Sequence, residues 1–206
     1  MNALIRTAAA TVLLLGALAA DAKPASTPTP QQRQAAQKLA GISVRILDLG
    51  QLFRYNGSED SWYKSFQAIM TAEEFRCFTT KMGTSQGFRA YKMDEALDYV
   101  QHRSPQDLQR DFALLTPQTV QALSRLMSAF TQEDRSPGLF RQEVEKLRQD
   151  PPLFDAVDRF MSGEQHRDLR QLLLSFTFDT NNFENSVHSF QRYAFWSLKA
   201  CHIPVE

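Results

Sequence analysis

Apolar residues recur along most of this chain at the spacing of an α-helix. Between residues 31 and 55 they step by four and by three positions, which places them on one face of a helix. The pattern predicts a first helix over about 31–55 that ends at Asn56-Gly57. Packing inside its own bundle is the favoured interpretation of this face, and a seam for a partner helix is the alternative. The stripe consists of Ala35, Leu39, Ile42, Ile46, Leu49 and Phe53.

A second helix start is marked at Thr71. Thr71 stands three positions before Glu74, the pattern of a capping box in which hydroxyl and carboxylate bond each other's backbone amides. The helix should end at Gly83, and residues 84–87 should form a tight connection to the next helix, which begins near Phe88. A short helix over 58–70 should precede this unit.

Proline marks most of the remaining helix starts. Ser104-Pro105, Thr116-Pro117 and Ser136-Pro137 each put a capping hydroxyl before a proline at the first helical position. Pro151-Pro152 opens a helix that Gly163 stops. Two more helices should cover 164–178 and 183–202, with a turn at 179–182 between them. Together these segments predict a compact all-α bundle of about nine short helices. The unequal spacing of the Ser/Thr-Pro starts leaves a helical-repeat solenoid as the alternative.

The N-terminus has the order of a secretory signal peptide. One basic residue in 1–6 precedes an apolar run over 7–18, and small residues at Ala20 and Ala22 then provide a cleavage site. The run is too short for an ordinary membrane-spanning helix. We therefore expect a signal peptide at 1–22, a flexible Pro/Thr-rich leader at 23–32 and a single helical domain at 33–206. The mature protein should be exported, to a bacterial periplasm, and should keep no transmembrane segment.

The chain contains two cysteines, Cys77 and Cys201. In an exported protein a pair of cysteines favours one disulfide. Such a bond would join an early helix of the domain to its last helix and would close a loop of more than a hundred residues. Two separate buried thiols are the alternative, because the sequence does not show how far apart the two residues lie.

Charge and motifs argue against several functions. The chain has 23 basic and 23 acidic side chains, whereas a nucleic-acid-binding protein needs a basic surface. The four histidines form no helical metal-ligand pair such as HExxH, and no phosphate-binding glycine loop or serine elbow is present. We therefore expect no metal and no cofactor. The histidines are His102, His166, His188 and His202.

Two catalytic alternatives remain in the same short segment. Cys77 lies near a helix N-terminus, where a thiolate is favoured, but phenylalanines flank it. Glu73 and Glu74 are carboxylates of the type that a cell-wall hydrolase uses, although helix capping already accounts for Glu74. We therefore predict a protein that is not an enzyme, with a hydrolase as the alternative.

Aromatic residues crowd the last predicted helix on more than one face. Tyr193 and Trp196 do not fit its main apolar stripe, and Arg192 lies beside them. Tyrosine, tryptophan and arginine are the residues that most often dominate the energetics of protein interfaces. Packing against the first helix is the simpler interpretation, and these three residues are the candidate partner-binding site.

Residues 69–93 resemble a family of exported bacterial all-helical domains of unknown function. The resemblance consists of Thr71, Glu73 and Glu74, then the small-residue break at 84–87, then Lys92. The chain departs from that family at Lys81-Met82, where an F-Y pair is usual. The resemblance covers about one eighth of the chain and implies an exported all-α fold with no established activity.

These observations favour an exported protein that acts by binding another protein of the cell envelope. One version is an immunity or inhibitor protein that neutralises a toxin or enzyme, and a chaperone or accessory factor of an envelope assembly is the second. The sequence does not indicate an oligomeric state.

Overall fold

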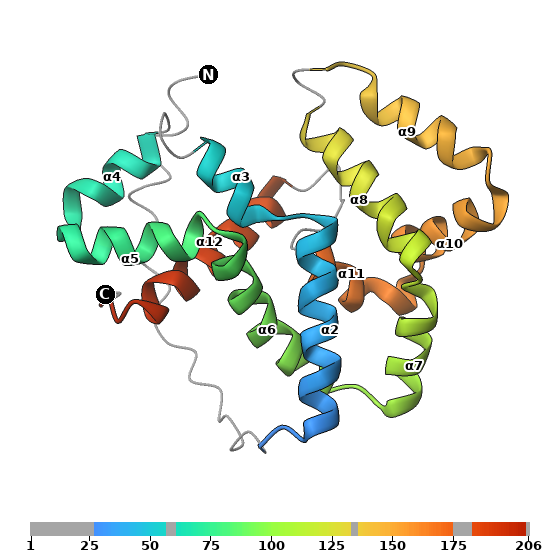
Figure 1. Cartoon of the computed structure of the whole chain (residues 1–206), viewed down its shortest axis with the longest axis horizontal. Coiled ribbons are helices and arrows are strands. Elements are labelled where there is room, and N and C mark those ends of the chain that lie inside the picture. Colours follow the sequence, from blue (N-terminus) through green and yellow to red (C-terminus); the bar gives the residue numbers. More distant parts are fainter. Residues whose placement is uncertain (1–26, 57–60, 133–135, 175–182, 205–206) are drawn as a thin grey trace.

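The protein folds as an all-α domain in the computed structural model, which describes residues 27–56, 61–132, 136–174 and 183–204. The predicted signal peptide at 1–22, the first part of the leader and the predicted turn at 179–182 lie outside these residues. Within them the chain forms eleven α-helices and one 3₁₀ helix (Figure 1). These are α2 (Pro30–Ile46), α3 (Leu49–Asn56), α4 (Ser61–Ile69), α5 (Ala72–Met82), α6 (Ser85–Gln101), α7 (Pro105–Leu114), α8 (Pro117–Thr131), α9 (Leu139–Arg148), α10 (Pro151–Ser162), η1 (Glu164–His166), α11 (Arg167–Leu174) and α12 (Phe183–Ala200).

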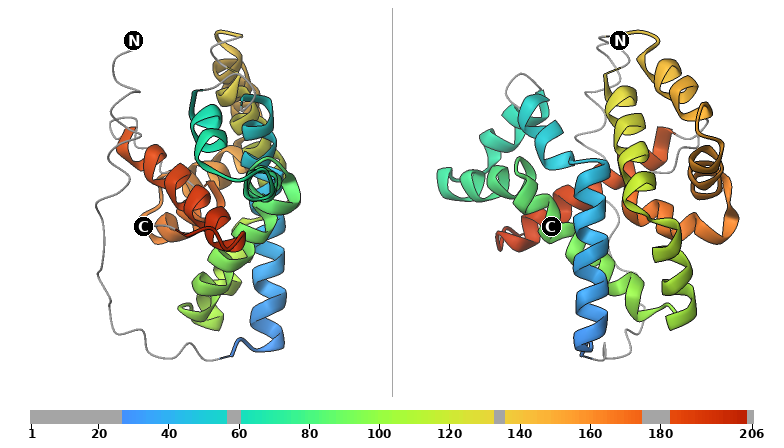
Figure 2. Two further views of the ribbon diagram at one scale, coloured as in Figure 1. Left: turned by 90° about the vertical axis from the view of Figure 1, so that its left-hand side faces the viewer. Right: turned by 45° about the vertical axis from the view of Figure 1, so that its right-hand side comes forward.

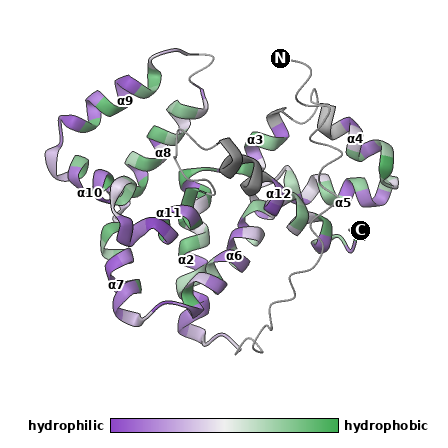
Figure 3. Ribbon diagram, turned by 180° about the vertical axis from the view of Figure 1, so that it is seen from behind, coloured by the Kyte–Doolittle hydropathy of each residue, from purple (hydrophilic) through white to green (hydrophobic). Residues whose placement is uncertain are grey.

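Helix α2 is the centre of the arrangement. It contacts α6, α8 and α11, and Figure 1 shows α3, α4, α5 and α12 on one side of it and α7 to α10 on the other. The right-hand view of Figure 2 also has α4 and α5 at the opposite edge from α9 and α10. The predicted stripe of α2 is buried at Leu39, Ile42 and Ile46. Most helices carry both a hydrophobic and a hydrophilic face (Figure 3), as expected for helices around one core.

The predicted first helix is two helices. Leu47 adopts an extended conformation at the end of α2, and the Asp48 carboxylate accepts the Gln51 amide at 3.2 Å, which starts α3. The break lets α3 pack on the start of α6, where a Cβ on Gly50 would lie only 2.2 Å from the Thr84 carbonyl oxygen. The apolar stripe continues through both helices, and it therefore concealed the bend.

Three further boundaries differ from the prediction. Helix α2 starts at Pro30, inside the predicted leader, because Thr29 and Gln32 form a capping box there. Thr84 caps α6 directly, and the predicted connection over 84–87 is therefore shorter than expected. Ser136-Pro137 does not start a helix. Gly138, with a positive φ of 87°, turns the chain, and α9 begins one residue later.

The other marked starts are confirmed. Thr71 and Glu74 form the predicted capping box, with the Thr71 amide 2.8 Å from the Glu74 carboxylate. This backbone hydrogen bond lowers the pKa of Glu74 below its usual range. Ser104 and Thr116 cap α7 and α8 ahead of their prolines. Helix α12 ends at Ala200, two residues earlier than predicted, and His202 turns the chain with a φ of 56°.

The last carbonyls of α5 are paired by its own C-cap residue, by the N-cap residue of α6 and by a side chain of α12. The Gly83 amide bonds the Thr79 carbonyl, and the Thr84 hydroxyl donates to that of Thr80 at 2.7 Å. The Tyr193 hydroxyl of α12 donates to the Lys81 carbonyl at 2.6 Å and lies 3.4 Å from that of Met82. Every carbonyl that the helix leaves without an internal partner is thereby satisfied.

A disulfide also joins α5 to the end of α12. The Sγ atoms of Cys77 and Cys201 are 2.04 Å apart and their Cα atoms 5.9 Å apart. The pairing predicted from the two cysteines is therefore present, across 124 positions of sequence. It excludes Cys77 as a thiol nucleophile while the bond is intact.

Lys92 forms a second buried link, a hydrogen bond from α6 to the end of α11. Its side chain is fully buried, and its ammonium donates to the Leu172 carbonyl at 2.7 Å and to the Glu95 carboxylate at 2.5 Å. Burial lowers the pKa of Lys92, and the Glu95 carboxylate opposes this effect. A lysine at a helix C-terminus pairs a carbonyl that would otherwise be left without a partner.

We predict that the double variant Cys77→Ser/Cys201→Ser folds with lower stability. Loss of a cross-link over this loop length costs up to about 5 kcal/mol in the chain-entropy model, which urea unfolding of the variant and the oxidised protein measures. Intact mass should also rise by two hydrogens on reduction. Ready alkylation of both thiols without reductant would show that the bond does not form in solution.

Two helical glycines make a matched test of the packing at the end of α5. A Cβ on Gly87 would lie 1.9 Å from the Lys81 carbonyl oxygen, whereas one on Gly41 meets nothing closer than 3.7 Å. Gly87→Ala should destabilise the protein by more than about 2 kcal/mol, and Gly41→Ala should stabilise it by up to about 1 kcal/mol. Thermal and urea unfolding of both variants provide the comparison, and equal effects would contradict this packing.

Candidate functional site

The aromatic site predicted on α12 is not an exposed cluster. Tyr193 has an exposed fraction of 0%, and its ring packs against Phe53, Phe88 and Tyr91 at centroid distances of 6.0, 5.3 and 4.9 Å. The prediction that Tyr193 contacts a partner is therefore wrong. The buried stripe of α12 includes Tyr193 and Ser197, and the polar serine concealed it in the sequence.

Trp196 and Arg192 differ from Tyr193. Trp196 is half-buried, and its indole donates to the Asp94 carboxylate of α6 at 2.7 Å. Its ring lies 5.8 Å from that of Tyr91, so Trp196 serves contacts within the fold. Arg192 is exposed, and its part in binding stays a prediction. The structure therefore separates the three residues that the sequence grouped.

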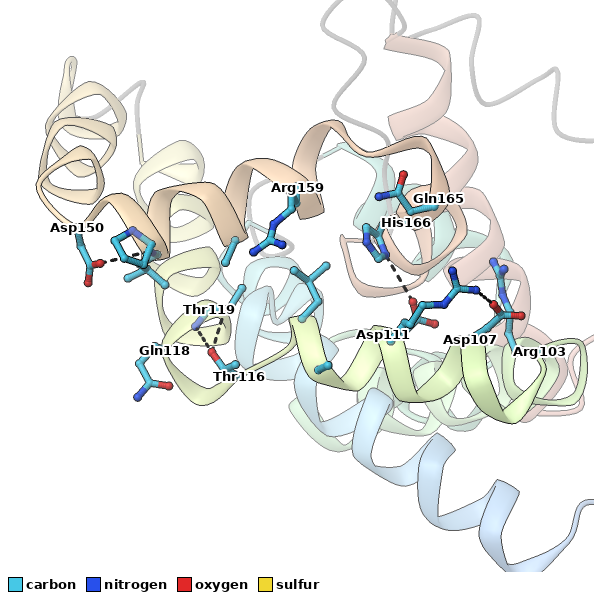
Figure 4. Close-up of a pocket in the computed structure, with 16 residues that line it drawn as sticks. Arg103, Asp107, Asp111, Thr116, Gln118, Thr119, Asp150, Arg159, Gln165 and His166 are labelled. Atoms are coloured by element: carbon cyan, nitrogen blue, oxygen red, sulfur yellow. Dashed lines mark hydrogen bonds and ion pairs between the residues drawn. The ribbon is translucent and has the colours of Figure 1, made fainter.

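A cavity lies on the other side of the molecule, between α7, the start of α8, and α10 with η1 (Figure 4). Its volume is about 660 Å³, which is in the range of sites for small ligands or peptide ends. The lining consists of Arg103, Asp107, Arg110, Asp111, Ala113, Leu114, Thr116, Gln118, Thr119, Asp150, Pro152, Leu153, Ala156, Arg159, Gln165 and His166.

Asp111 and His166 form the most buried polar pair of this cavity. Asp111 Oδ1 lies 3.5 Å from His166 Nδ1, and Asp111 Oδ2 accepts from the Tyr99 hydroxyl at 2.6 Å. Burial, and then the hydrogen bond to Asp111, raise the pKa of Tyr99, and the phenol therefore remains a donor. Among the described side chains His166 Nδ1 is the one buried polar atom without a hydrogen bond. Nε2 makes no hydrogen bond there and is not among those buried atoms, and His166 is one of the residues that line the cavity.

Two of the three lining arginines are neutralised by neighbours. Arg110 forms an ion pair with Asp107, and Arg103 forms one with Asp168. The guanidinium of Arg103 also lies 4.8 Å from the centre of the Tyr99 ring. These pairs hold the α7 side of the cavity in place and leave little free charge there.

Arg159 of α10 is the third lining arginine. Its Nε atom donates to the Asp155 carbonyl at 3.2 Å, and within the described residues its terminal nitrogens form no ion pair or hydrogen bond. Arg159 and His166 both lie on the side of the cavity formed by α10 and η1 (Figure 4). This side therefore provides hydrogen-bond donors for a ligand.

The rest of the lining, from α7, the start of α8 and the first turns of α10, is a mixture of capping groups and apolar side chains. The Thr116 hydroxyl accepts from the Thr119 amide at 3.1 Å, and Asp150 accepts from the Leu153 amide at 3.2 Å. Both groups are occupied by their own helices. The apolar side chains are Ala113, Leu114, Pro152, Leu153 and Ala156.

The chemistry of this lining suits recognition more directly than covalent catalysis. The lining residues include no serine or cysteine, and the two threonine hydroxyls bond each other, with that of Thr116 also capping α8. Within the described part of the chain no group of three or more His, Cys, Asp or Glu side chains is placed to hold a metal ion. His166, with the Asp111 carboxylate 3.5 Å from its Nδ1 atom, could still act as a general base on a bound water.

The cavity was not predicted, and His166 was interpreted only as part of a helix start. Asp111 belongs to the predicted helix after Ser104-Pro105, where its spacing gives it a partly inward position. Nothing in the sequence indicates that it meets His166, which lies 55 residues later.

Comparison with known proteins gives no match: no family model, no curated protein and no solved structure is similar to this chain at a significant level. The resemblance of residues 69–93 to an exported bacterial family thus stays a prediction. Among the described residues no helix is both long enough and apolar enough to cross a membrane.

Substitution of Asp111 tests the polar pair. Asp111→Leu leaves the Tyr99 hydroxyl without its acceptor, and should cost about 1–3 kcal/mol for one unsatisfied group. Asp111→Asn keeps an acceptor for Tyr99 and should cost less than about 1 kcal/mol. Urea unfolding of the two variants gives the difference, and equal stabilities would mean that the hydrogen bond from Tyr99 to Asp111 contributes nothing.

Proposed function

We propose that this protein is an exported, non-enzymatic helical protein that acts by binding another protein of the cell envelope, and that the cavity between α7, α8 and α10 is its recognition site. The observation that carries the proposal is the cavity itself, which combines the terminal guanidinium nitrogens of Arg159, unpaired among the described residues, with an apolar wall. Recognition sites typically combine apolar surface with a few placed polar groups.

Export is supported by two independent features. The N-terminal residues have the composition of a signal peptide, and the cysteines pair as cysteines of exported proteins do. The proposed compartment is the bacterial periplasm, with no cofactor and no nucleic acid involved. An immunity or inhibitor protein is the version we favour, and an accessory factor or chaperone of an envelope assembly remains compatible with the same cavity.

A cell-wall hydrolase is the second candidate, and the Asp111–His166 pair is the observation that favours it. A histidine held by a carboxylate beside an open cavity is a general-base arrangement. The hydrolase formerly suggested by Glu73 and Glu74 has less support, because Glu74 is engaged in the capping box and the two residues lie away from the cavity.

Filling the cavity separates binding there from binding elsewhere. The protein, immobilised at low density, is exposed to an envelope extract and to purified candidate toxins. We expect one partner in stoichiometric amount on the wild type, and its loss on Ala156→Trp, which places an indole among the lining residues. Ala68→Trp on the exposed face of α4 is the matched control and should retain the partner.

The opposite pattern would contradict the proposed site: capture retained by Ala156→Trp and lost by Ala68→Trp places binding on the α4–α5 side. Turnover of peptidoglycan by the purified protein, abolished by His166→Gln, would instead establish the hydrolase and overturn the non-enzymatic proposal.

A further inference from the structure

The arginines that line the cavity indicate what kind of ligand it binds. Of its three arginines, two have carboxylate partners, Asp107 for Arg110 and Asp168 for Arg103. Arg159 alone of the three forms no ion pair among the described residues, and its one hydrogen bond runs from Nε to the Asp155 carbonyl. A guanidinium binds a carboxylate through two parallel hydrogen bonds. The cavity therefore has a place for one carboxylate of a ligand.

His166 adds a second donor to the same side of the cavity. Its Nδ1 atom faces Asp111 at 3.5 Å, and Nε2 makes no hydrogen bond among the described residues. In the doubly protonated ring both nitrogens donate, so the ring can bond Asp111 on one side and a ligand oxyanion on the other. Asp111 is held in turn by Tyr99. With a ligand carboxylate bound beside Arg159, the order of groups would be the Asp111 carboxylate, the protonated His166 ring, the ligand carboxylate and the Arg159 guanidinium, so that negative and positive charges alternate.

The rest of the lining indicates what is attached to that carboxylate. Leu114, Leu153, Pro152 and Ala156 form an apolar wall next to the polar side. The wall can bury one apolar side chain, and the volume of about 660 Å³ accommodates more than a single ion. The chemistry is therefore that of a carboxylate close to an apolar group.

We infer that the cavity captures the C-terminal end of the bound chain, with the terminal carboxylate between Arg159 and His166 and an apolar last side chain against Leu114 and Leu153. This inference rests on the proposed function, since it names the part of the partner that the cavity takes. Capture of a chain terminus by fixed donors is an established mode of peptide recognition. It requires no change in the backbone of this protein.

Labelled peptides test the inference without knowledge of the partner. Two pools of fluorescein-labelled pentapeptides, random at four positions and ending in Leu, differ only in a free or an amidated C-terminus. Fluorescence anisotropy with the full chain should give at least about tenfold tighter binding for the free acid, the effect of losing charge-assisted hydrogen bonds. A free-acid pool that ends in Asp should bind more weakly than the pool that ends in Leu.

Arg159→Gln should remove the preference for the free acid. Arg141→Gln, at an exposed position on α9 outside the cavity, is the matched control and should retain it. Circular dichroism and thermal unfolding establish that each variant is folded. His166→Gln should reduce the preference as well, without loss of binding to the amide pool.

Three results would overturn the inference: equal affinity for acid and amide, an unchanged preference in Arg159→Gln, or displacement of the peptide by millimolar inorganic phosphate, which would indicate a general oxyanion site. Each of them leaves the proposed function standing if Ala156→Trp still abolishes capture of the whole partner. If no partner is captured but the free-acid peptides still bind tightly, the cavity binds C-terminal carboxylates and the proposed function of binding an envelope protein is wrong.

Discussion

The paired carbonyls at the end of α5 are the constraint on which half of this fold depends. A helix end packed against other helices needs donors for its last carbonyls, because the packing limits their access to water. Here the donors come from Gly83 and Thr84 next in sequence and from Tyr193 more than a hundred residues later. The disulfide from Cys77 is one turn away on the same helix, so α12 is fixed to α5 at two points.

Helix α6 connects this end of α5 and α12 to the cavity. Phe88 and Tyr91 at its start pack on Tyr193, Lys92 pairs the end of α11, and Tyr99 near its end bonds Asp111. One helix thus connects the disulfide-linked side of the molecule with the groups behind the cavity. The cavity residues themselves come from short helices whose caps, Thr116 and Asp150, face it. Its shape therefore depends on where those helices start.

Local rules were sufficient for much of the fold. The helical class, the caps at Thr71, Ser104 and Thr116, and the buried stripe of α2 all follow from spacing and capping chemistry. These are properties of a few neighbouring residues. The bend at Asp48 was not predictable in this way, because the apolar stripe continues across it and the close approach of Gly50 to Thr84 that goes with it is a long-range contact.

The candidate site was harder to predict because its defining contacts are long-range. Tyr193 appeared as a possible anchor because the buried serine at 197 interrupts the apolar pattern of its face. Asp111 and His166 each have an ordinary helical context, and only the packing of η1 on α7 brings them to 3.5 Å. The pairing of the two cysteines was predictable because no other cysteine competes for either.

The central claim is that binding occurs at the cavity, on the opposite side of α2 from the disulfide. Hydrogen–deuterium exchange of the full chain, with and without the captured partner, tests it most directly. The account predicts new protection at α7, the first turn of α8, and α10 with η1, with α5 and α12 unchanged. Protection confined to α4 or to the exposed side of α12 around Arg192 would contradict it.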